Sequence, residues 1–186
     1  AGHDAEEIDV WIKPEDKDYL SFMEELVKKR LPDEFYQQLC ANEAGFQLLC
    51  FAAFGIPRAL LNMLHEILET NSTSNKAIST RRVNSAIKQS SANTLDVYRS
   101  LKLKIPMYRN FLQVGENIIN SSVELIKEYN KNKPVTRQSV TIAIQTPLDT
   151  EINRTLGFLE YAALISPKGK ISRGEKGTFQ LYAVNY

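Results

Sequence analysis

The stretch CFAAFGIPRALLNMLHEIL, residues 50–68, joins two apolar runs through the step Gly-Ile-Pro-Arg. A glycine followed two residues later by a proline is a favourable place for one helix to end and the next to begin. We therefore predict a helix that ends near Gly55 and a second that begins at Pro57. Arg58 falls in the first turn of that second helix, where the helix dipole favours anions and a cation gains nothing locally. This placement makes Arg58 a candidate for contact with an external partner.

Apolar residues recur at helical spacing on both sides of this step. An alternating apolar segment at residues 8–14 is typical of a short strand or an extended arm, and a polar linker occupies residues 70–80. Asn42 is a plausible N-cap for the apolar run that follows it. The helices that the pattern predicts lie within residues 14–31, 32–40, 43–54, 57–69, 80–103 and 106–131.

The last 52 residues have a different composition, and we place a domain boundary near Pro134. SVTIAI, residues 139–144, is β-branched, and periodicity alone does not distinguish a strand from a short buried helix there. Residues 146–165 form an amphipathic pattern, with Ile152, Leu156, Leu159, Ala163 and Leu164 on one face. A β-hairpin with a glycine-rich tip at residues 173–177 is predicted next. Helix, strand, glycine-rich turn and strand form the second half of a winged helix.

The predicted fold is therefore mainly α: a helical bundle followed by a C-terminal winged-helix domain whose β-hairpin is the wing. We divide the chain into an N-terminal arm (1–14), a helical subdomain (15–78), a long-helix connector (79–133) and the winged-helix domain (134–186).

Composition places the chain among ordinary soluble globular proteins, with 43% hydrophobic and 24% charged residues. No apolar run is long enough to cross a bilayer, and the acidic N-terminus lacks the apolar region of a secretory signal. We expect a cytoplasmic location. Cys40 and Cys50 lie in apolar segments that are predicted to be helical, where a free cysteine is usually a small buried hydrophobic residue. With only His3 and His65 beside them they predict no metal centre, and His65 is expected to be a partly buried structural histidine.

The net charge of +1 hides an uneven distribution. Residues 131–186 carry eight Lys or Arg and four Asp or Glu, whereas the first 130 residues carry 15 and 18. The C-terminal part is thus +4 and the rest −3, which is only a modest indication about the partners of the chain.

The Gly55-Ile56-Pro57-Arg58 step between two apolar helices resembles the second sensor in the lid of STAND and AAA+ ATPases, especially the branch of origin-recognition-complex-like initiators. In that family the lid follows the nucleotide-binding core, and a winged helix follows the lid. This chain has the same order of parts. Position 56 is Ile where the family more usually has a polar residue. The resemblance implies that Arg58, on its Gly55 and Pro57 turn, reaches the triphosphate of bound ATP.

The chain itself has no phosphate loop of the form G-x-x-x-x-G-K-[ST] and no apolar strand that ends in two acids to hold Mg²⁺. We therefore expect no catalysis by this chain alone. If the resemblance holds, the chain is the C-terminal part of a longer ATPase, and ATP and Mg²⁺ bind an N-terminal core. In the other interpretation, Arg58 pairs with Glu66 or Glu43, or is simply solvated.

For the winged helix, a DNA-binding interpretation places Asn153 and Arg154 on the major-groove helix. The wing cations Lys168, Lys170, Arg173 and Lys176 would then approach phosphates. The acids Asp149, Glu151 and Glu160 on the same helix favour protein docking instead. Two further functions stay open: a winged-helix transcriptional regulator that dimerises through residues 80–131, and a helical interaction scaffold.

Overall fold

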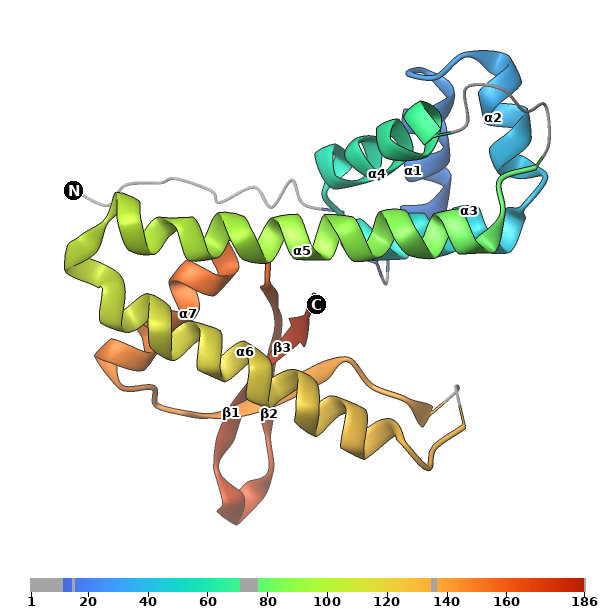
Figure 1. Ribbon diagram of the computed structural model, residues 1–186. Helices are drawn as coiled ribbons and strands as arrows, with labels where there is room; N and C mark the ends of the chain where they lie inside the picture. Colours follow the sequence, from blue (N-terminus) through green and yellow to red (C-terminus); the bar gives the residue numbers. More distant parts are fainter. Residues whose placement is uncertain (1–11, 15, 71–76, 135–136, 186) are drawn as a thin grey trace, which may run out of the picture. The chain divides into compact units, whose positions relative to one another are not determined.

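A computed structural model describes residues 12–14, 16–70, 77–134 and 137–185 (Figure 1). The chain is mainly helical, with a small antiparallel sheet near its C-terminus. It divides into two compact units, residues 1–90 and 91–186. The arm predicted at residues 8–14 falls largely outside the described residues. Within the described ranges, no helix is long and apolar enough to cross a membrane.

Unit 1 is a bundle of short helices, and every helix predicted in it is present. They are α1 (Tyr19–Lys28), α2 (Asp33–Cys40), α3 (Glu43–Ala52), α4 (Pro57–Thr70) and the first part of α5 (Thr80–Lys104). Asn42 caps α3 as predicted, because its side chain accepts a hydrogen bond of 3.1 Å from the Gly45 amide. The same side chain donates to the Ile78 carbonyl at 2.7 Å and so holds the start of α5 against the bundle. The core is formed by the inward faces of all five helices.

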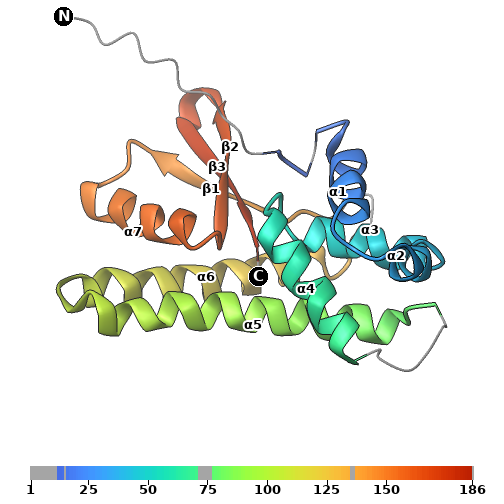
Figure 2. The same cartoon turned by 90° about the horizontal axis from the view of Figure 1, so that it is seen from above.

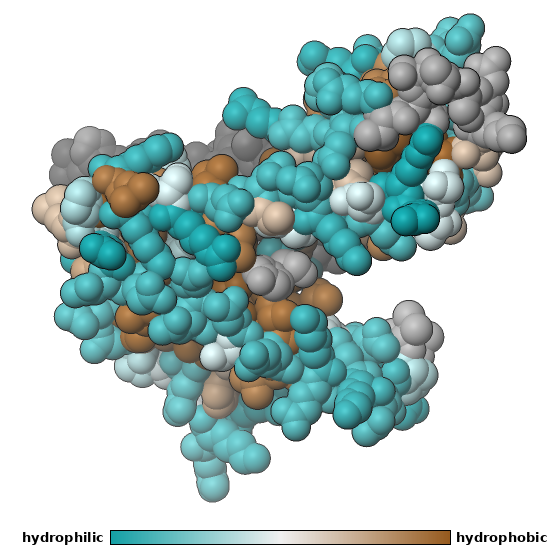
Figure 3. Space-filling view, viewed as in Figure 1, coloured by the Kyte–Doolittle hydropathy of each residue, from teal (hydrophilic) through white to brown (hydrophobic). Residues whose placement is uncertain are grey.

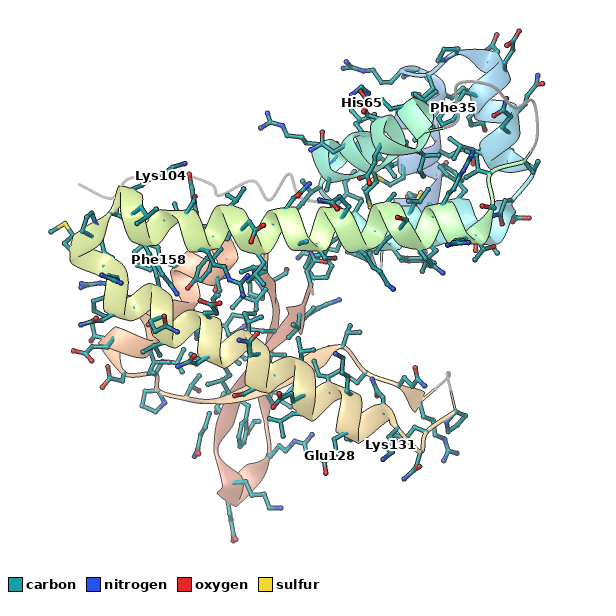
Figure 4. The ribbon with its side chains drawn as sticks, viewed as in Figure 1. Phe35, His65, Lys104, Glu128, Lys131 and Phe158 are labelled. Carbon is teal, nitrogen blue, oxygen red and sulfur yellow. The ribbon has the colours of Figure 1, made fainter. Side chains whose placement is uncertain are left out.

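Two predictions of burial in unit 1 are wrong. Cys50 is buried, but Cys40 is exposed at the end of α2. His65 is 72% exposed and forms an i,i+4 pair with Glu69 at 3.1 Å (Figure 4). The apolar stripe of α4 runs through Leu64, and one residue further along a helix turns the side chain about 100° away from the stripe.

Unit 2 begins with a helical hairpin in which the second half of α5 runs beside α6 (Arg109–Asn130), as Figure 2 shows. A short 3₁₀ turn, Pro106–Tyr108, joins them. The two helices approach closely at Gly115, where the buried Tyr98 hydroxyl donates to the Leu112 carbonyl at 3.1 Å. Nearby, Glu116 accepts hydrogen bonds from Lys102 and Arg99 at 2.6 and 2.7 Å, which lowers the pKa of its carboxyl group.

The rest of unit 2 consists of β1 (Thr141–Thr146), α7 (Thr150–Tyr161), β2 (Ile165–Ser172) and β3 (Thr178–Val184). The sheet is antiparallel with the order β1-β3-β2. Residues 141–146 are thus a strand, which decides between the two alternatives that the sequence left open. The predicted hairpin is confirmed as β2 and β3. The preceding helix is shorter than its apolar pattern, because it ends at Tyr161 and Ala163 takes a left-handed conformation (φ 57°) that turns the chain into β2.

Candidate functional site

The turn between α3 and α4 holds the Gly-Ile-Pro-Arg step. Phe54 and Gly55 both have left-handed backbone conformations, with φ of 54° and 77°. Glycine adopts this conformation without strain, whereas a residue with a side chain does so at a cost of about 1 kcal/mol or more. The pair of left-handed residues ends α3 and redirects the chain, so that α4 begins at Pro57 as the sequence predicts.

Tyr19 fixes this turn from inside unit 1. Its hydroxyl donates to the Cys50 carbonyl and accepts a hydrogen bond of 3.1 Å from the Gly55 amide. The Tyr19 side chain is only 1% exposed, and burial raises the pKa of its phenol to about 12. The hydroxyl is therefore protonated at physiological pH and is available as a donor. No local sequence signal points to this role of Tyr19, because its hydrogen-bond partners lie more than thirty residues away.

Arg58 lies on the first turn of α4 and is exposed. Among the described residues it forms no ion pair, and Glu43 instead accepts a hydrogen bond of 3.1 Å from Gln47. Its guanidinium therefore faces solvent from a turn whose backbone is fixed by buried hydrogen bonds. A planar guanidinium in this position is able to bind an anion with two parallel hydrogen bonds.

The β2-β3 hairpin, which the sequence predicts to be a wing, carries most of the cations predicted for unit 2. Lys170, Arg173 and Lys176 are exposed along β2 and the tip, whereas Lys168 is partly buried. The tip is a tight turn in which the Arg173 amide donates to the Gly177 carbonyl at 2.9 Å. Gly177 has a φ of 89°, in the left-handed range that favours glycine. The turn thus displays two cations, Arg173 and Lys176, on a short, hydrogen-bonded loop, and Lys170 lies nearby on β2.

The two polar residues predicted on α7 differ in their surroundings. Asn153 is exposed, whereas the Arg154 guanidinium lies over the Phe111 ring of α6, 5.6 Å from its centroid. Asp149 caps α7 by accepting a hydrogen bond of 2.6 Å from the Glu151 amide. Burial raises the pKa of the Glu160 carboxyl in the last turn. The exposed side of α7 therefore presents both signs of charge.

Gly55, Pro57 and Arg58 are together on unit 1, whereas Asn153, Arg154 and the wing cations belong to unit 2. Among the described residues, no group of three or more His, Cys, Asp or Glu side chains is arranged to hold a metal ion. The chain matches no protein-family profile, no curated protein and no solved structure.

Proposed function

We propose that this chain is the lid and winged-helix portion of a P-loop ATPase of the STAND or AAA+ type. In this proposal Arg58 senses the nucleotide, and the wing contacts a partner. The observation that supports it best is the state of Arg58: an exposed guanidinium, unpaired within the described residues, on a turn fixed by Tyr19. The order of the parts, with a helical bundle before a helix and a β-hairpin, supports it as well.

ATP and Mg²⁺ would bind the ATPase core, and the core would supply the hydrolytic chemistry. The role of this chain in the proposal is to bind the phosphates of the nucleotide and to release them. Arg58 donates hydrogen bonds to phosphate oxygens while the terminal phosphate is present, and it loses a partner once that phosphate leaves. Because the turn is held by buried hydrogen bonds, a change in the position of Arg58 displaces α3 and α4 together rather than one side chain alone.

Replacing Arg58 with alanine in the protein that carries both this chain and its ATPase core tests the sensor. We expect ATP turnover to fall about ten- to a hundredfold, because a hydrogen bond to a charged group contributes about 1.5–3 kcal/mol. The far-UV circular dichroism should stay the same, since the side chain is exposed. Arg30→Ala, at another exposed arginine of unit 1, is the matched control and should leave turnover unchanged.

Unchanged turnover in Arg58→Ala would remove the sensor role. A gene that encodes no phosphate loop ahead of this segment would remove the whole ATPase proposal. In that case the transcriptional regulator and the helical scaffold would be the remaining functions.

The wing has its own test, because its exposed cations suit either duplex DNA or an acidic protein surface. If the partner is DNA, replacing Lys170, Arg173 and Lys176 with glutamine should lower the slope of log affinity against log salt by about 2 to 3, at roughly 0.9 per phosphate contact. The control replaces Lys104, Arg109 and Lys127, which are exposed on the helical hairpin. A wild-type chain that is indifferent to duplex DNA would favour protein docking. A stable dimer with steep salt dependence would favour the regulator.

A further inference from the structure

Unit 2 contains an open groove of about 610 Å³ between α6 and the sheet. Leu125, Ile126 and Tyr129 of α6 form one wall, and Ala143, Ile171 and Leu181 from the three strands contribute to the other side. Leu125 and Tyr129 are 63% and 56% exposed, so the groove leaves large apolar side chains in contact with water. In the space-filling view, brown hydrophobic atoms interrupt the teal surface in the region of α6 and the strands (Figure 3).

The free edge of β1 borders this groove. The Val184 amide donates to the Val140 carbonyl at 2.9 Å, and in the antiparallel register Ile142 stands opposite Tyr182. Because hydrogen-bonded pairs alternate along such a ladder, the amides and carbonyls of Thr141, Ala143 and Gln145 point away from β3. The Thr141 amide is bound by the Ser139 hydroxyl at 3.1 Å. The outward groups of Ala143 and Gln145 are left for another strand.

The two edges of the sheet are protected to different degrees. β2 carries Pro167, Lys168 and Lys170, and its register shifts between Pro167 and Gly169. Proline, lysine and irregular register are the features with which proteins prevent unwanted pairing at an edge. β1 has the sequence TIAIQT, with neither a charge nor a proline. Only the edge beside the groove is therefore open to strand addition.

Charges around the groove indicate what kind of segment fits. Arg173 lines the groove. Lys133 contacts Tyr129, which also lines it, and its ammonium group is 2.8 Å from the centroid of the Tyr129 ring. Lys133 also lowers the pKa of the Tyr129 phenol through a hydrogen bond. Glu128 is the acidic residue of the lining. Two cations against this one carboxylate favour a ligand that carries an acidic group.

We propose that β1 and the groove bind an extended segment of a partner polypeptide. The segment pairs with the free main-chain groups of Ala143 and Gln145 and so adds a strand to the sheet. Its alternate apolar side chains contact Leu125 and Tyr129, and an acidic side chain pairs with Arg173. This site involves neither Arg58 nor a nucleotide, so it stands or falls separately from the ATPase proposal.

The test uses the full chain and a short peptide in which valine alternates with threonine and glutamate. Amide hydrogen exchange is followed by NMR. In the free chain the Ala143 and Gln145 amides should exchange quickly, and the Ile142 and Ile144 amides slowly. On addition of the peptide, exchange at Ala143 and Gln145 should slow about tenfold or more, because each gains a main-chain hydrogen bond. Unchanged exchange at these two amides, or protection along β2 instead, would overturn the proposal.

Two matched pairs of variants make the test specific. Ala143→Pro removes an outward amide without breaking the bonds to β3, and it should abolish peptide binding. Ser172→Pro at the edge of β2 is its control and should bind normally. Leu125→Ser keeps the strand intact and should weaken binding about tenfold, whereas Val97→Ser, at a residue of similar exposure on α5, should not. Equal binding by Leu125→Ser and Val97→Ser would contradict an apolar groove site even if Ala143→Pro failed to fold.

Discussion

Replacing Gly115 with alanine should destabilise unit 2 by about 1–2 kcal/mol, although alanine is the better helix former. A Cβ at this position would lie 2.1 Å from the Tyr98 hydroxyl oxygen, closer than real Cβ contacts allow. Tyr98 is fully buried, so its ring has no free space into which to retreat. Overpacking of this kind costs about 1–3 kcal/mol or more, and the gain in helix propensity returns only about 1 kcal/mol. Urea unfolding followed by circular dichroism measures the difference.

A double-mutant cycle identifies the cause of this loss. Tyr98→Phe removes the hydroxyl, and the nearest remaining ring atom would then be 3.3 Å from the new Cβ. The variant with both Gly115→Ala and Tyr98→Phe should therefore be clearly more stable than the sum of the two single changes predicts. Gly157→Ala is the control, because nothing lies within 4 Å of a Cβ there, and it should stabilise the chain by about 0.5–1 kcal/mol. If the two single substitutions change the free energy of unfolding additively, the helices move apart freely at Gly115.

Replacing Tyr19 with phenylalanine should destabilise unit 1 by about 1–3 kcal/mol. The change leaves the buried Gly55 amide without an acceptor and the Cys50 carbonyl without the hydroxyl donor. An unsatisfied buried donor costs its full desolvation penalty, whereas an exposed hydrogen bond is largely replaced by water. Tyr36→Phe is therefore a matched control, because it makes the same chemical change at an exposed hydrogen bond. It removes a hydrogen bond of 2.5 Å to Glu24 that lies at the surface, and it should cost well under about 1 kcal/mol.

Tyr19→Phe also separates the stability of the turn from its role in placing Arg58. Hydrogen exchange at the Gly55 amide should accelerate in this variant, because the acceptor is gone, while Arg58 itself is unchanged. If Arg58 senses a nucleotide, ATP turnover in the protein with its core should fall in Tyr19→Phe and not in Tyr36→Phe. An unaltered Gly55 exchange rate would show that the hydroxyl does not hold the turn.

Much of the secondary structure could be predicted from local sequence patterns. The positions of the helices in unit 1, the Asn42 cap and the β2-β3 hairpin all follow from periodicity, capping chemistry and turn residues, which act within a few residues of one another. The same patterns located Arg58 at the start of α4. Such patterns indicate which face of a helix or strand is apolar, and they do so for each element separately.

Predictions failed or stayed open where the outcome depends on a neighbour distant in the sequence. Residues 141–146 become a strand because β3, some forty residues further on, pairs with them. Cys40 is exposed because the bundle covers the other side of α2. The helix α7 ends before its apolar pattern does, because Leu164 and Ile165 pack in the core of unit 2 and β2 begins at Ile165. The groove beside β1 likewise forms only where α6 meets the three strands of the sheet.

For this protein, the amino-acid sequence by itself determined where the helices of residues 14–131 lie, where the C-terminal hairpin turns, and that the chain carries no phosphate loop of its own. Only the tertiary structure decided that Tyr19 holds the turn of Arg58, that Gly115 makes room for Tyr98, and that one edge of the sheet is left open. The physical reason is the range of the interactions. Helix and turn preferences are set by neighbours along the chain, whereas buried hydrogen bonds, close packing and strand edges arise only when distant segments meet.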